Sequence, residues 1–382
     1  MNVIIIVFLS LAVTISLLHL IISAIIMTQK IRLASNDVTI RKDYKYPSII
    51  ILKPLKGIDD GLEDNLRSFF KLDYPDFEII FGMETYRDPA FEIVRKLQNE
   101  FKAVKSKLVV NDFAIGLNPK VNNMYNMYPS AIGEYIFIND SNTRVESDFL
   151  KKLALEFDTE NVGLVTATIR GVGAKNITSI WENLHLNTFV APNVFIAKIF
   201  ANISIVIGKS ILIPKRVLDE IGGFTVLKNY LAEDFLLGVK VKEAGYEIKT
   251  SLTMVDNVNE KISFQRFLNR HSRWAKMRRN IDIKHYLLEW FSNPIFASLI
   301  MMSYLHNTDG YLVFSSVALL KIAHDYYIMK LMKSDFNWHN IFAVPFKDLA
   351  IALIWFTPFF SYKVKWRENK IKIGKNSILN AA

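Results

Sequence analysis

Apolar and polar positions fall into blocks along the chain, and these blocks predict a buried β-sheet. The chain has five short apolar bursts: SIIIL at Ser48, EIIFGM at Glu78, KLVV at Lys107, YIFIN at Tyr135 and VGLVT at Val162. Continuous apolar strands of this length are typical of a sheet covered on both faces. The amphipathic stretch AFEIVRKLQNEF after Asp88 predicts a crossover helix. The middle of the chain is therefore expected to be an α/β domain with a mostly parallel sheet.

A longer apolar run, from Val3 to Met27, predicts a membrane-spanning helix. Its length suffices to cross a hydrocarbon core of roughly 30 Å. It also lacks the preceding positive charge that a cleaved signal peptide carries. Basic residues follow the run at Lys30, Arg32, Arg41, Lys42 and Lys45, and none precedes it. This asymmetry predicts a retained anchor, with the following domain on the cytoplasmic side.

Further apolar runs lie near 286–305, 311–332 and 341–360, and charges interrupt them. A charge at the centre of a membrane helix costs about 2.5–3.5 kcal/mol, so these charges need partners or an interfacial position. Lys321 and Asp325 stand four residues apart and are predicted to pair on one helix face. Glu289, Lys347 and Asp348 are the other interrupting charges. We expect at least one run to be re-entrant or interfacial.

This pattern divides the chain into regions, and composition limits their chemistry. We expect an anchor (1–30), the α/β domain (47–280), C-terminal membrane segments (281–365) and a basic tail (366–382). The 382 residues carry a formal net charge of +10 and no cysteine. The absence of cysteine excludes disulfides, thiolate metal sites and thiol nucleophiles. Chemistry must therefore rest on carboxylates, His, Lys, Arg and hydroxyls.

Acidic residues follow several of the predicted strands. Glu84, Asp112 and Asp140 come just after apolar bursts, where ligands bind in sheets of this kind. Asp140, in YIFINDSNTR, is suited to hold Mg²⁺ or Mn²⁺ against a diphosphate, because hard oxygen ligands suit these cations. A turn aspartate that stabilises its own loop explains Asp140 equally well.

A second acidic pair opens a predicted helix. Glu233 and Asp234, in NYLAEDFLLGVKVKEAGYEI, begin a helix that is expected to end at Gly245. Adjacent acids at a helix start often serve only as favourable charges on the helix dipole. The alternative is a general base, which requires a held carboxylate within reach of a hydroxyl proton.

The basic stretch RHSRWAKMRR, residues 270–279, precedes the apolar C-terminal runs. In a helix, Arg270 and Arg273 lie on one face, as a guanidinium clamp on a departing diphosphate requires. An interfacial helix beside anionic lipid headgroups also fits the charge, and we expect Lys276 to Arg279 to face such headgroups. A nucleic-acid patch fits poorly, because no recognised fold accompanies it and membrane segments flank it.

Short motifs in a particular order resemble those of the membrane-bound ceramide glucosyltransferases and their bacterial relatives, including hopanoid-associated ones. The motifs are KPLKG at Lys53, an acid near Glu84, GLNPKVNN at Gly116, NDS at Asn139, GGF at Gly222, AED at Ala232 and RHSRW at Arg270. The resemblance extends from about Ser48 to Arg279, and the flanking apolar segments fit the same layout.

The resemblance implies a GT-A glycosyltransferase that moves a hexose, glucose from UDP-glucose, to the hydroxyl of a membrane lipid such as ceramide, with inversion. It implies the following roles: Asp234 as catalytic base with Glu233 beside it, Asp140 as the acid for Mg²⁺ or Mn²⁺, Glu84 in the nucleotide pocket, Lys120 as a phosphate or nucleotide contact, and Arg270, Arg273 and Trp274 over the diphosphate and the acceptor entrance. The implied partners are a UDP-sugar, a lipid acceptor and the bilayer, without nucleic acid. The implied setting is a multi-pass membrane protein, in a bacterial inner membrane rather than the Golgi.

The chain departs from the family pattern at three points. Glu84 replaces the usual Asp, and Asp88 is an alternative for the same role. Asn142 stands where many relatives have a second acid of the metal site. VAPN at Val190 lacks the histidine expected before the proline, so a hopanoid-type or glycerolipid acceptor stays open. Two other hypotheses also stay open: a processive polysaccharide synthase of the same fold, and a non-enzymatic membrane scaffold.

Overall fold

The computed structural model describes residues 3–37, 44–366 and 369–381, and it separates into two compact units. We call residues 32–172 and 197–260 the sheet unit, and residues 1–31, 173–196 and 261–382 the helical unit. Arg41 and Lys42 of the basic flank lie outside the described residues. Residues 173–196 and 261–280, which the sequence places in the α/β domain, group with the apolar helices.

The sheet unit is built on one eight-stranded sheet in the order β3-β2-β1-β4-β7-β6-β8-β5. Strands β3, β2, β1 and β4 are parallel, and β6 is parallel to β8, whereas β7 is antiparallel to both of its neighbours. The five apolar bursts all lie in this sheet, so the predicted α/β fold with a mostly parallel sheet is confirmed. The strands are β1 (Ile49–Pro54), β2 (Phe77–Met83), β3 (Ser106–Val110), β4 (Tyr135–Ile138), β5 (Thr143–Arg144), β6 (Val162–Val172), β7 (Ile211–Pro214) and β8 (Glu247–Val258).

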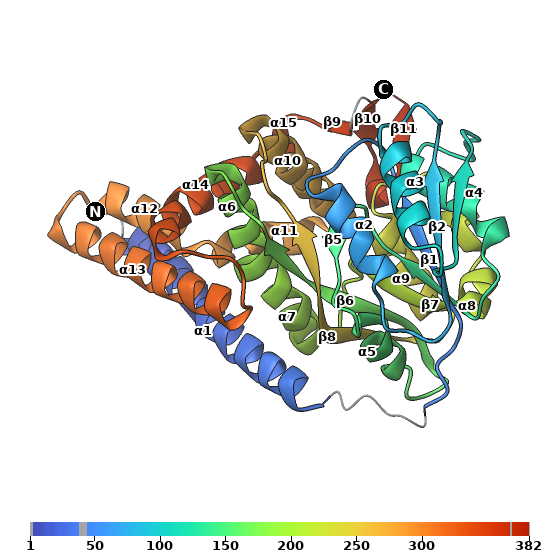
Figure 1. Ribbon diagram of the computed structural model, residues 1–382. Helices are drawn as coiled ribbons and strands as arrows, with labels where there is room; N and C mark the ends of the chain where they lie inside the picture. The colour runs from blue at the N-terminus through green and yellow to red at the C-terminus, as the bar shows by residue number, and fades with distance from the viewer. Residues whose placement is uncertain (1–2, 38–43, 367–368, 382) are drawn as a thin grey trace. The chain divides into compact units, whose positions relative to one another are not determined.

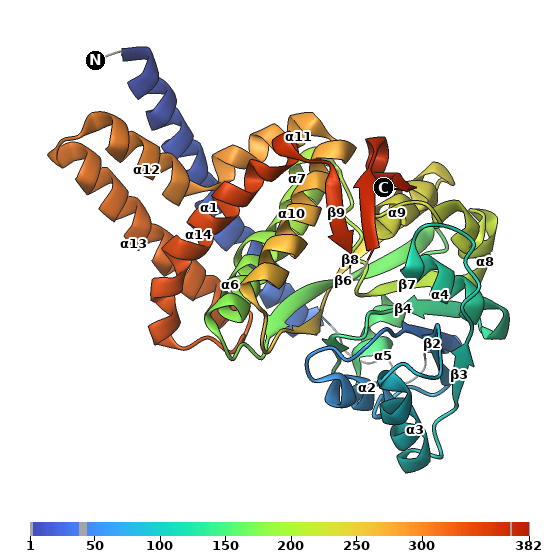
Figure 2. The same cartoon turned by 90° about the horizontal axis from the view of Figure 1, so that it is seen from above.

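Helices cover both faces of this sheet, as Figure 2 shows. On one face, Val121 of α4 and Leu237 of α9 share a core with Ile80 of β2. On the other face, Phe149 of α5 packs against Phe137 of β4. The predicted crossover helix is α3, and the helix predicted to open at Glu233 is α9. The helices are α2 (Leu62–Phe70), α3 (Ala90–Glu100), α4 (Pro119–Met127), α5 (Phe149–Leu155), α8 (Lys215–Glu220) and α9 (Glu233–Glu243).

The ends of several strands meet at one edge of the sheet. Strands β1, β2 and β4 are parallel, and Ile49 pairs with both Phe77 and Tyr135, so their carboxyl ends lie together. Strand β7 runs the opposite way, with Ile211 opposite Ile138. The loop that precedes β7 therefore reaches the same edge as the loop that follows β4.

The helical unit contains the apolar helices and a small three-stranded antiparallel sheet (Figure 1). Two of its strands lie in the predicted basic tail (366–382), and the third begins at the end of the predicted membrane segments (281–365). The elements are α1 (Val3–Asp37), α6 (Ile177–His185), η2 (Leu186–Val190), α7 (Ala191–Ala201), α10 (Phe264–Ile281), α11 (Ile283–Leu288), η4 (Glu289–Ser292), α12 (Pro294–Leu305), α13 (Thr308–Leu331), η5 (Trp338–Phe342), α14 (Ala343–Trp355), α15 (Thr357–Phe360), β9 (Lys363–Trp366), β10 (Asn369–Ile373) and β11 (Leu379–Ala381).

Four helical stretches in the described part of the chain are long and apolar enough to cross a membrane: Val3–Ala34, Ile177–Ala201, Thr308–Leu331 and Trp338–Phe360. The second of these was not predicted, because polar residues such as Glu182 dilute its apolar character. The run near 286–305 is broken before Pro294, and α12 has only 12 residues. At 1.5 Å per residue this helix is about 18 Å long, too short to cross a core of roughly 30 Å.

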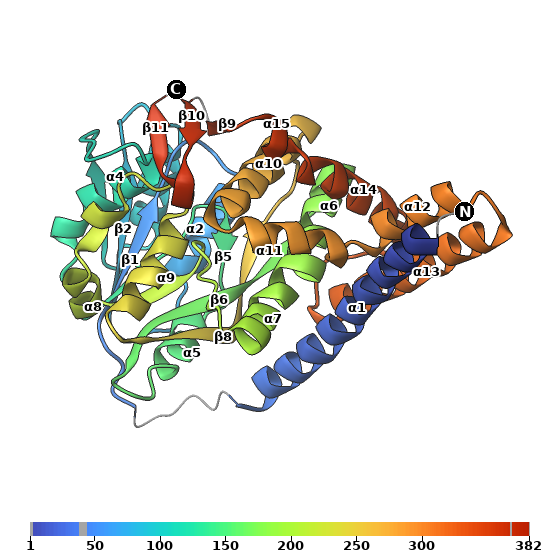
Figure 3. The same ribbon diagram turned by 180° about the vertical axis from the view of Figure 1, so that it is seen from behind.

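Helices α1 and α13 lie side by side, as Figures 2 and 3 show. The Ser23 hydroxyl is 2.7 Å from His324 Nε2, and the Thr28 and Tyr327 hydroxyls are 2.6 Å apart. Ala12 of α1 packs in one core with residues of α12 and α13. These contacts fix the N-terminal helix to the C-terminal ones.

The charges within the apolar runs pair with one another. Lys321 Nζ lies 2.5 Å from Asp325 Oδ1, which confirms the predicted pairing on one helix face. Lys347 also pairs with Asp348, and Lys321 reaches Asp348 Oδ2 at 3.5 Å. We call these four residues the membrane charge cluster. Its two lysines and two aspartates balance in charge.

Candidate active site

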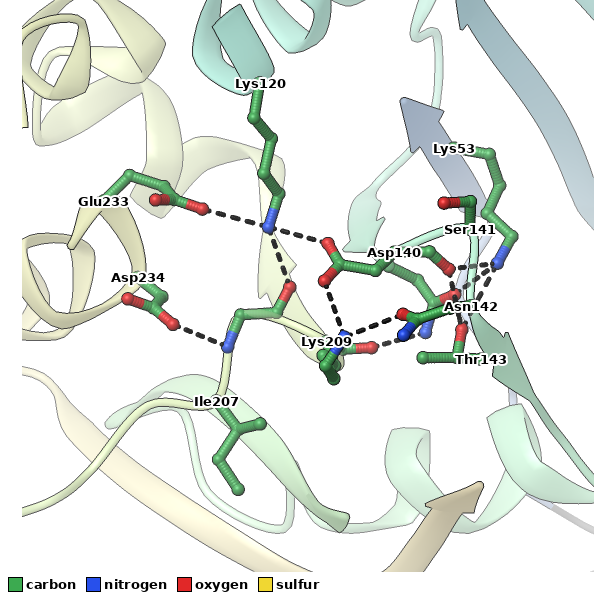
Figure 4. Close-up of polar contacts among 12 residues, drawn as sticks. Lys53, Lys120, Asp140, Ser141, Asn142, Thr143, Ile207, Lys209, Glu233 and Asp234 are labelled. Carbon is green, nitrogen blue, oxygen red and sulfur yellow. Dashed lines mark hydrogen bonds and ion pairs between the residues drawn. The ribbon is translucent and has the colours of Figure 1, made fainter. Parts of the chain in front are cut away.

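Asp140 lies just beyond β4, and a lysine contacts each of its carboxylate oxygens. Lys120 Nζ is 2.8 Å from Oδ1, and Lys209 Nζ is 3.0 Å from Oδ2. Figure 4 shows the two ammonium groups reaching Asp140 from different elements. Burial alone would raise the pKa of Asp140, but the two lysines outweigh burial and hold that pKa below its usual range. The carboxylate is therefore ionised at neutral pH.

Lys120 is placed by the start of helix α4. The Asn118 side chain caps this helix by accepting hydrogen bonds from the N–H groups of Lys120 and Val121. The ammonium then bridges two acids, at 2.8 Å from Asp140 and 2.9 Å from Glu233, and donates to the Gly208 carbonyl at 3.1 Å. Burial opposes the charge on Lys120, but Asp140 and Glu233 outweigh it and raise the pKa of Lys120.

Asp234, in the first turn of α9, has both carboxylate oxygens tied to backbone N–H groups. Gly208 donates to Oδ2 at 2.9 Å, and Phe235 donates to Oδ1 at 2.8 Å. A Cβ atom at position 208 would lie 2.6 Å from Asp234 Oδ2, so the close approach requires glycine. Burial, and then the neighbouring Glu233, raises the pKa of Asp234 to about 6. Asp234 is thus a held carboxylate with a pKa near neutrality, as a general base requires.

Sequence reasoning missed Lys209, which precedes β7. Its ammonium lies where two oxygens converge, 3.0 Å from Asp140 Oδ2 and 2.7 Å from Asn142 Oδ1. The Asn139 side chain holds its backbone by donating to the Lys209 carbonyl. In the sequence, Lys209 is only a lysine that follows an apolar run, and this position does not predict a site residue.

Lys53, which was given no role from the sequence, contacts the loop that carries Asp140. Its side chain is fully buried, with Nζ 3.6 Å from the centre of the Phe69 ring. The ammonium donates to the Asp140 carbonyl at 2.8 Å and to the Asn139 side chain. Burial lowers the pKa of Lys53 well below its usual value. Lys53 therefore supports the Asp140 loop from the side of β1.

The acids near the end of β2 take different positions. Glu84 forms an ion pair with Lys56 at 2.8 Å, and both side chains are about 40% exposed. Asp88 accepts hydrogen bonds from the N–H groups of Gly57 and Ala90, at 2.8 and 2.9 Å. Asp88 thus ties a loop to the start of α3, whereas Glu84 keeps a half-exposed carboxylate. The assignment of Glu84 to a nucleotide pocket stays a prediction.

The basic motif lies on α10 in the helical unit. Arg270 pairs with Glu182 at 2.8 Å, and His271 Nε2 lies 2.8 Å from the same fully buried carboxylate. The Arg270 guanidinium is 5.9 Å from the centre of the Trp274 ring. The roles of Arg270, Arg273 and Trp274 at a diphosphate stay predictions. Glu182 was missed because no local pattern marks it and it stands 88 positions from Arg270.

The expectation that residues 276–279 face lipid headgroups is wrong for Lys276. This side chain is 8% exposed and donates to the Lys363 carbonyl at 2.7 Å. Its neighbour Arg278 forms an ion pair with Glu289 at 2.8 Å. The charges on this part of α10 are thus used inside the helical unit. Asp112, after β3 in the other unit, is exposed.

Comparison with known proteins decides the family. The family model described as Glycosyl transferase family 21 matches residues 11–379. The chain belongs to glycosyl transferase family 21.

Two relatives of this family 21 protein come from Caenorhabditis elegans. Ceramide glucosyltransferase 3 is 29% identical over 342 residues, covering 86% of this chain and 73% of that protein. Ceramide glucosyltransferase 1 is 26% identical, covering 87% and 73%. A mannosyltransferase from Pyrobaculum calidifontis, in complex with GDP-Man and Mn²⁺, is 15% identical with a TM-score of 0.49, covering 92% of this chain and 99% of that one.

Family 21 membership confirms the predicted resemblance and the prediction of a glycosyltransferase enzyme. It removes the hypothesis of a non-enzymatic membrane scaffold. The four long apolar helices in the described part of the chain support the prediction of a membrane protein.

The donor set at Asp140 fits a divalent cation that is shared with a phosphate ligand. The Asp140 carboxylate and the Asn142 amide oxygen both face the Lys209 ammonium, so a cation already lies where these hard oxygens converge. Within the described ranges, no group of three His, Cys, Asp or Glu side chains forms a complete metal site. Mg²⁺ commonly binds through one or two protein oxygens plus substrate phosphates, which matches this set.

Together these groups suit displacement of a diphosphate. The lysines beside Asp140 supply fixed positive charge of the kind that stabilises a leaving diphosphate. Asp234 lies on the other side of Lys120 and Glu233, as Figure 4 shows. Lys120, Asp140, Glu233 and Asp234, which the sequence analysis selected separately, therefore form one site in the structure.

Proposed function

We propose that this family 21 enzyme transfers a hexose, glucose from UDP-glucose, to the hydroxyl of a membrane lipid such as ceramide, with inversion at the anomeric carbon. The observation that carries the proposal is the partly buried Asp234 carboxylate, held by two backbone N–H groups beside the Lys120 bridge. The relatives' own names, ceramide glucosyltransferases, support the choice of sugar and acceptor.

In the proposed reaction, Asp234 takes the proton from the acceptor hydroxyl. The hydroxyl oxygen forms a bond to the anomeric carbon as the bond from that carbon to the diphosphate oxygen breaks. The electron pair of the broken bond leaves with UDP. One base is sufficient for this single displacement, whereas a double displacement with retention needs a carboxylate nucleophile as well. The raised pKa of Asp234, about 6, supports its role as a proton acceptor near neutral pH.

Lys120 and Lys209 stabilise the departing diphosphate in this proposal. The negative charge on the leaving group increases as its bond to the sugar breaks, so fixed cations stabilise the transition state more than the ground state. A divalent cation held by Asp140 and Asn142 supplies further electrophilic stabilisation of the diphosphate when it is bound. Lys53, on β1, holds the Asp140 loop through its hydrogen bond to the Asp140 carbonyl.

The remaining assignments rest on the resemblance. We assign Glu84 to the nucleotide pocket, which its half-exposed carboxylate supports. Arg270, Arg273 and Trp274 are assigned to the diphosphate and the acceptor entrance. The membrane setting is supported by the apolar helices, and a cytoplasmic site by the basic residues Lys30, Arg32 and Lys45, which follow the apolar run of α1.

Mass spectrometry of lipids from a bacterial host that expresses the chain tests this proposal. We expect a new lipid that is heavier by one hexose, and its fragmentation identifies the acceptor class. Asp234→Asn should abolish the product while the protein still enters the membrane. Asp158→Asn, an exposed partner of Lys249, is the matched control and should keep the product.

Other outcomes would contradict the proposal. A polymer in place of a singly glycosylated lipid would support a processive synthase. An unchanged lipid profile from well-expressed protein, in extracts that contain ceramide and added UDP-glucose, would reject the proposed donor and acceptor pair.

A further inference from the structure

The two lysines on Asp140 block the oxygens that a divalent cation would need. Lys120 holds Oδ1 at 2.8 Å, and Lys209 holds Oδ2 at 3.0 Å. Lys209 also holds Asn142 Oδ1 at 2.7 Å, so it takes both oxygens that converge at this point. A cation approaching Asp140 therefore meets two positive charges at contact distance.

Moving a lysine away from Asp140 has a cost unless the lysine finds another anion. The side chains of Lys120 and Lys209 are only 17% and 16% exposed, so water cannot fully replace the lost carboxylate. Removing the partner of a largely buried charge is strongly destabilising. A nucleoside diphosphate brings several negative charges on adjacent oxygens, and an ammonium group binds phosphate oxygens well.

The surroundings permit Lys209, in particular, to exchange partners. Its backbone is anchored by the Asn139 side chain, while its ammonium contacts the side-chain oxygens of Asp140 and Asn142. The Asp140 side chain is 28% exposed, more than the side chains of Lys120, Lys209 and Glu233. The long lysine side chain can therefore turn to a new anion while its loop stays in place.

We propose that Lys209 is a diphosphate ligand that occupies the cation position when no diphosphate is bound, so that a divalent cation binds at Asp140 and Asn142 more tightly with the diphosphate of the donor than without it. The diphosphate draws Lys209 away from Asp140, and the freed oxygens then accept the cation. This inference rests on the proposed function, because it takes the donor to be a nucleoside diphosphate sugar. By reciprocity, the cation must strengthen diphosphate binding by the same factor as the diphosphate strengthens cation binding.

Binding of Mn²⁺ to the full chain in lipid nanodiscs tests the inference, with free Mn²⁺ followed by electron paramagnetic resonance. We expect UDP to strengthen Mn²⁺ binding about tenfold or more, within the range of coupling between linked sites. Lys209→Met should bind Mn²⁺ more tightly than the native chain without UDP, and should lose most of the coupling. Lys209→Arg keeps the charge and should retain the coupling.

A control and a separate measurement make each outcome decisive. Lys105→Met removes an exposed lysine that pairs with Asp76, and it should behave as the native chain. Equal Mn²⁺ affinity with and without UDP, no Mn²⁺ binding even with UDP, or native coupling in Lys209→Met would each overturn the inference. Calorimetry of UDP binding without Mn²⁺ separates this inference from the proposed function. If UDP binds but does not change the Mn²⁺ affinity, only this inference is rejected. If UDP does not bind, the proposed donor is rejected as well.

Discussion

Two clusters of lysines and carboxylates lie in this chain, one in each unit, and they differ in exposure. In the cluster at Asp140, the side chains of Lys120, Lys209, Asp140 and Glu233 are 12–28% exposed. In the membrane charge cluster, the four side chains are at most 8% exposed. Both clusters pair their charges, so pairing by itself does not identify a functional site.

The difference lies in what carries the charges. The membrane charge cluster joins two apolar helices, α13 and α14, and its charges have only one another as partners of opposite sign among the described contacts, apart from His324 beside Asp325. The cluster at Asp140 lies on loops and helix starts at the edge of the sheet, and its side chains are partly exposed to solvent. A sealed cluster stabilises a fold, whereas an accessible one can exchange partners with a ligand.

The largest effect is expected for Asp234→Asn in the accessible cluster. The amide cannot take a proton from the acceptor, so kcat should fall by about 10²–10⁴-fold, the usual contribution of general base catalysis. Steady-state transfer from UDP-glucose to ceramide by the purified chain measures the effect. Unchanged UDP affinity serves as the control for folding. Native turnover in Asp234→Asn would show that Asp234 is not the base.

The next effect is on stability, at the sealed cluster. Asp325→Asn leaves Lys321 and Lys347 short of a buried negative charge, and breaking such a pair typically costs about 3–5 kcal/mol. Thermal unfolding in detergent should show a markedly lower Tm. Asp309→Asn makes the same change at an exposed position on the same helix and should have little effect. Equal Tm values for the two variants would show that the sealed cluster does not stabilise the fold.

The pH profile separates the two acids of the accessible cluster. Asp234 must be deprotonated to act as a base, and its pKa is raised to about 6, so kcat/KM should fall as the pH drops below about 6. The pKa of Asp140 is lowered, so Asp140 stays ionised throughout this range and does not contribute to the fall. Initial rates measured between pH 5 and 8, at intervals of roughly one pH unit, test the predicted fall in kcat/KM. A flat profile down to pH 5 would contradict the assignment of the base.

The smallest effect is expected at the exposed pair of Glu84 and Lys56. Glu84→Gln removes a surface ion pair, worth about 0–1 kcal/mol of stability, so the Tm should hardly change. Loss of a charged hydrogen-bond partner for the nucleotide should weaken UDP binding about tenfold, which calorimetry measures. Asp76→Asn, also in an exposed ion pair, should change neither quantity. Native UDP affinity in Glu84→Gln would show that Glu84 does not contact the nucleotide.

The sheet was largely predictable because buried strands leave continuous apolar bursts. The bursts at Ser48 and Tyr135 mark β1 and β4, and the helices α3 and α9 follow from their amphipathic patterns. Strand β7 was harder to predict, because ILIP lies within a longer apolar run that suits a helix equally well. The helix break before Pro294 and the unpredicted apolar helix Ile177–Ala201 depend on tertiary packing and capping, which hydropathy does not record.

The site was partly predictable for a related reason. Asp140 and Asp234 stand at element boundaries, where the sequence marks them with turn residues or an adjacent acid. Lys209 carries no such mark. It comes close to Asp140 only because β7 runs antiparallel beside β4. Glu182 is similar, since its partners on α10 are distant in sequence and no local pattern connects them.

The most direct test of the central claim is the product that the purified chain makes in nanodiscs from ¹³C-labelled UDP-glucose and ceramide. Mass spectrometry counts the labelled sugars on each lipid, and NMR of the product reports the anomeric configuration. We predict one labelled hexose per lipid, joined through a bond of inverted configuration. A retained configuration, or a chain of labelled sugars, would contradict single displacement by Asp234.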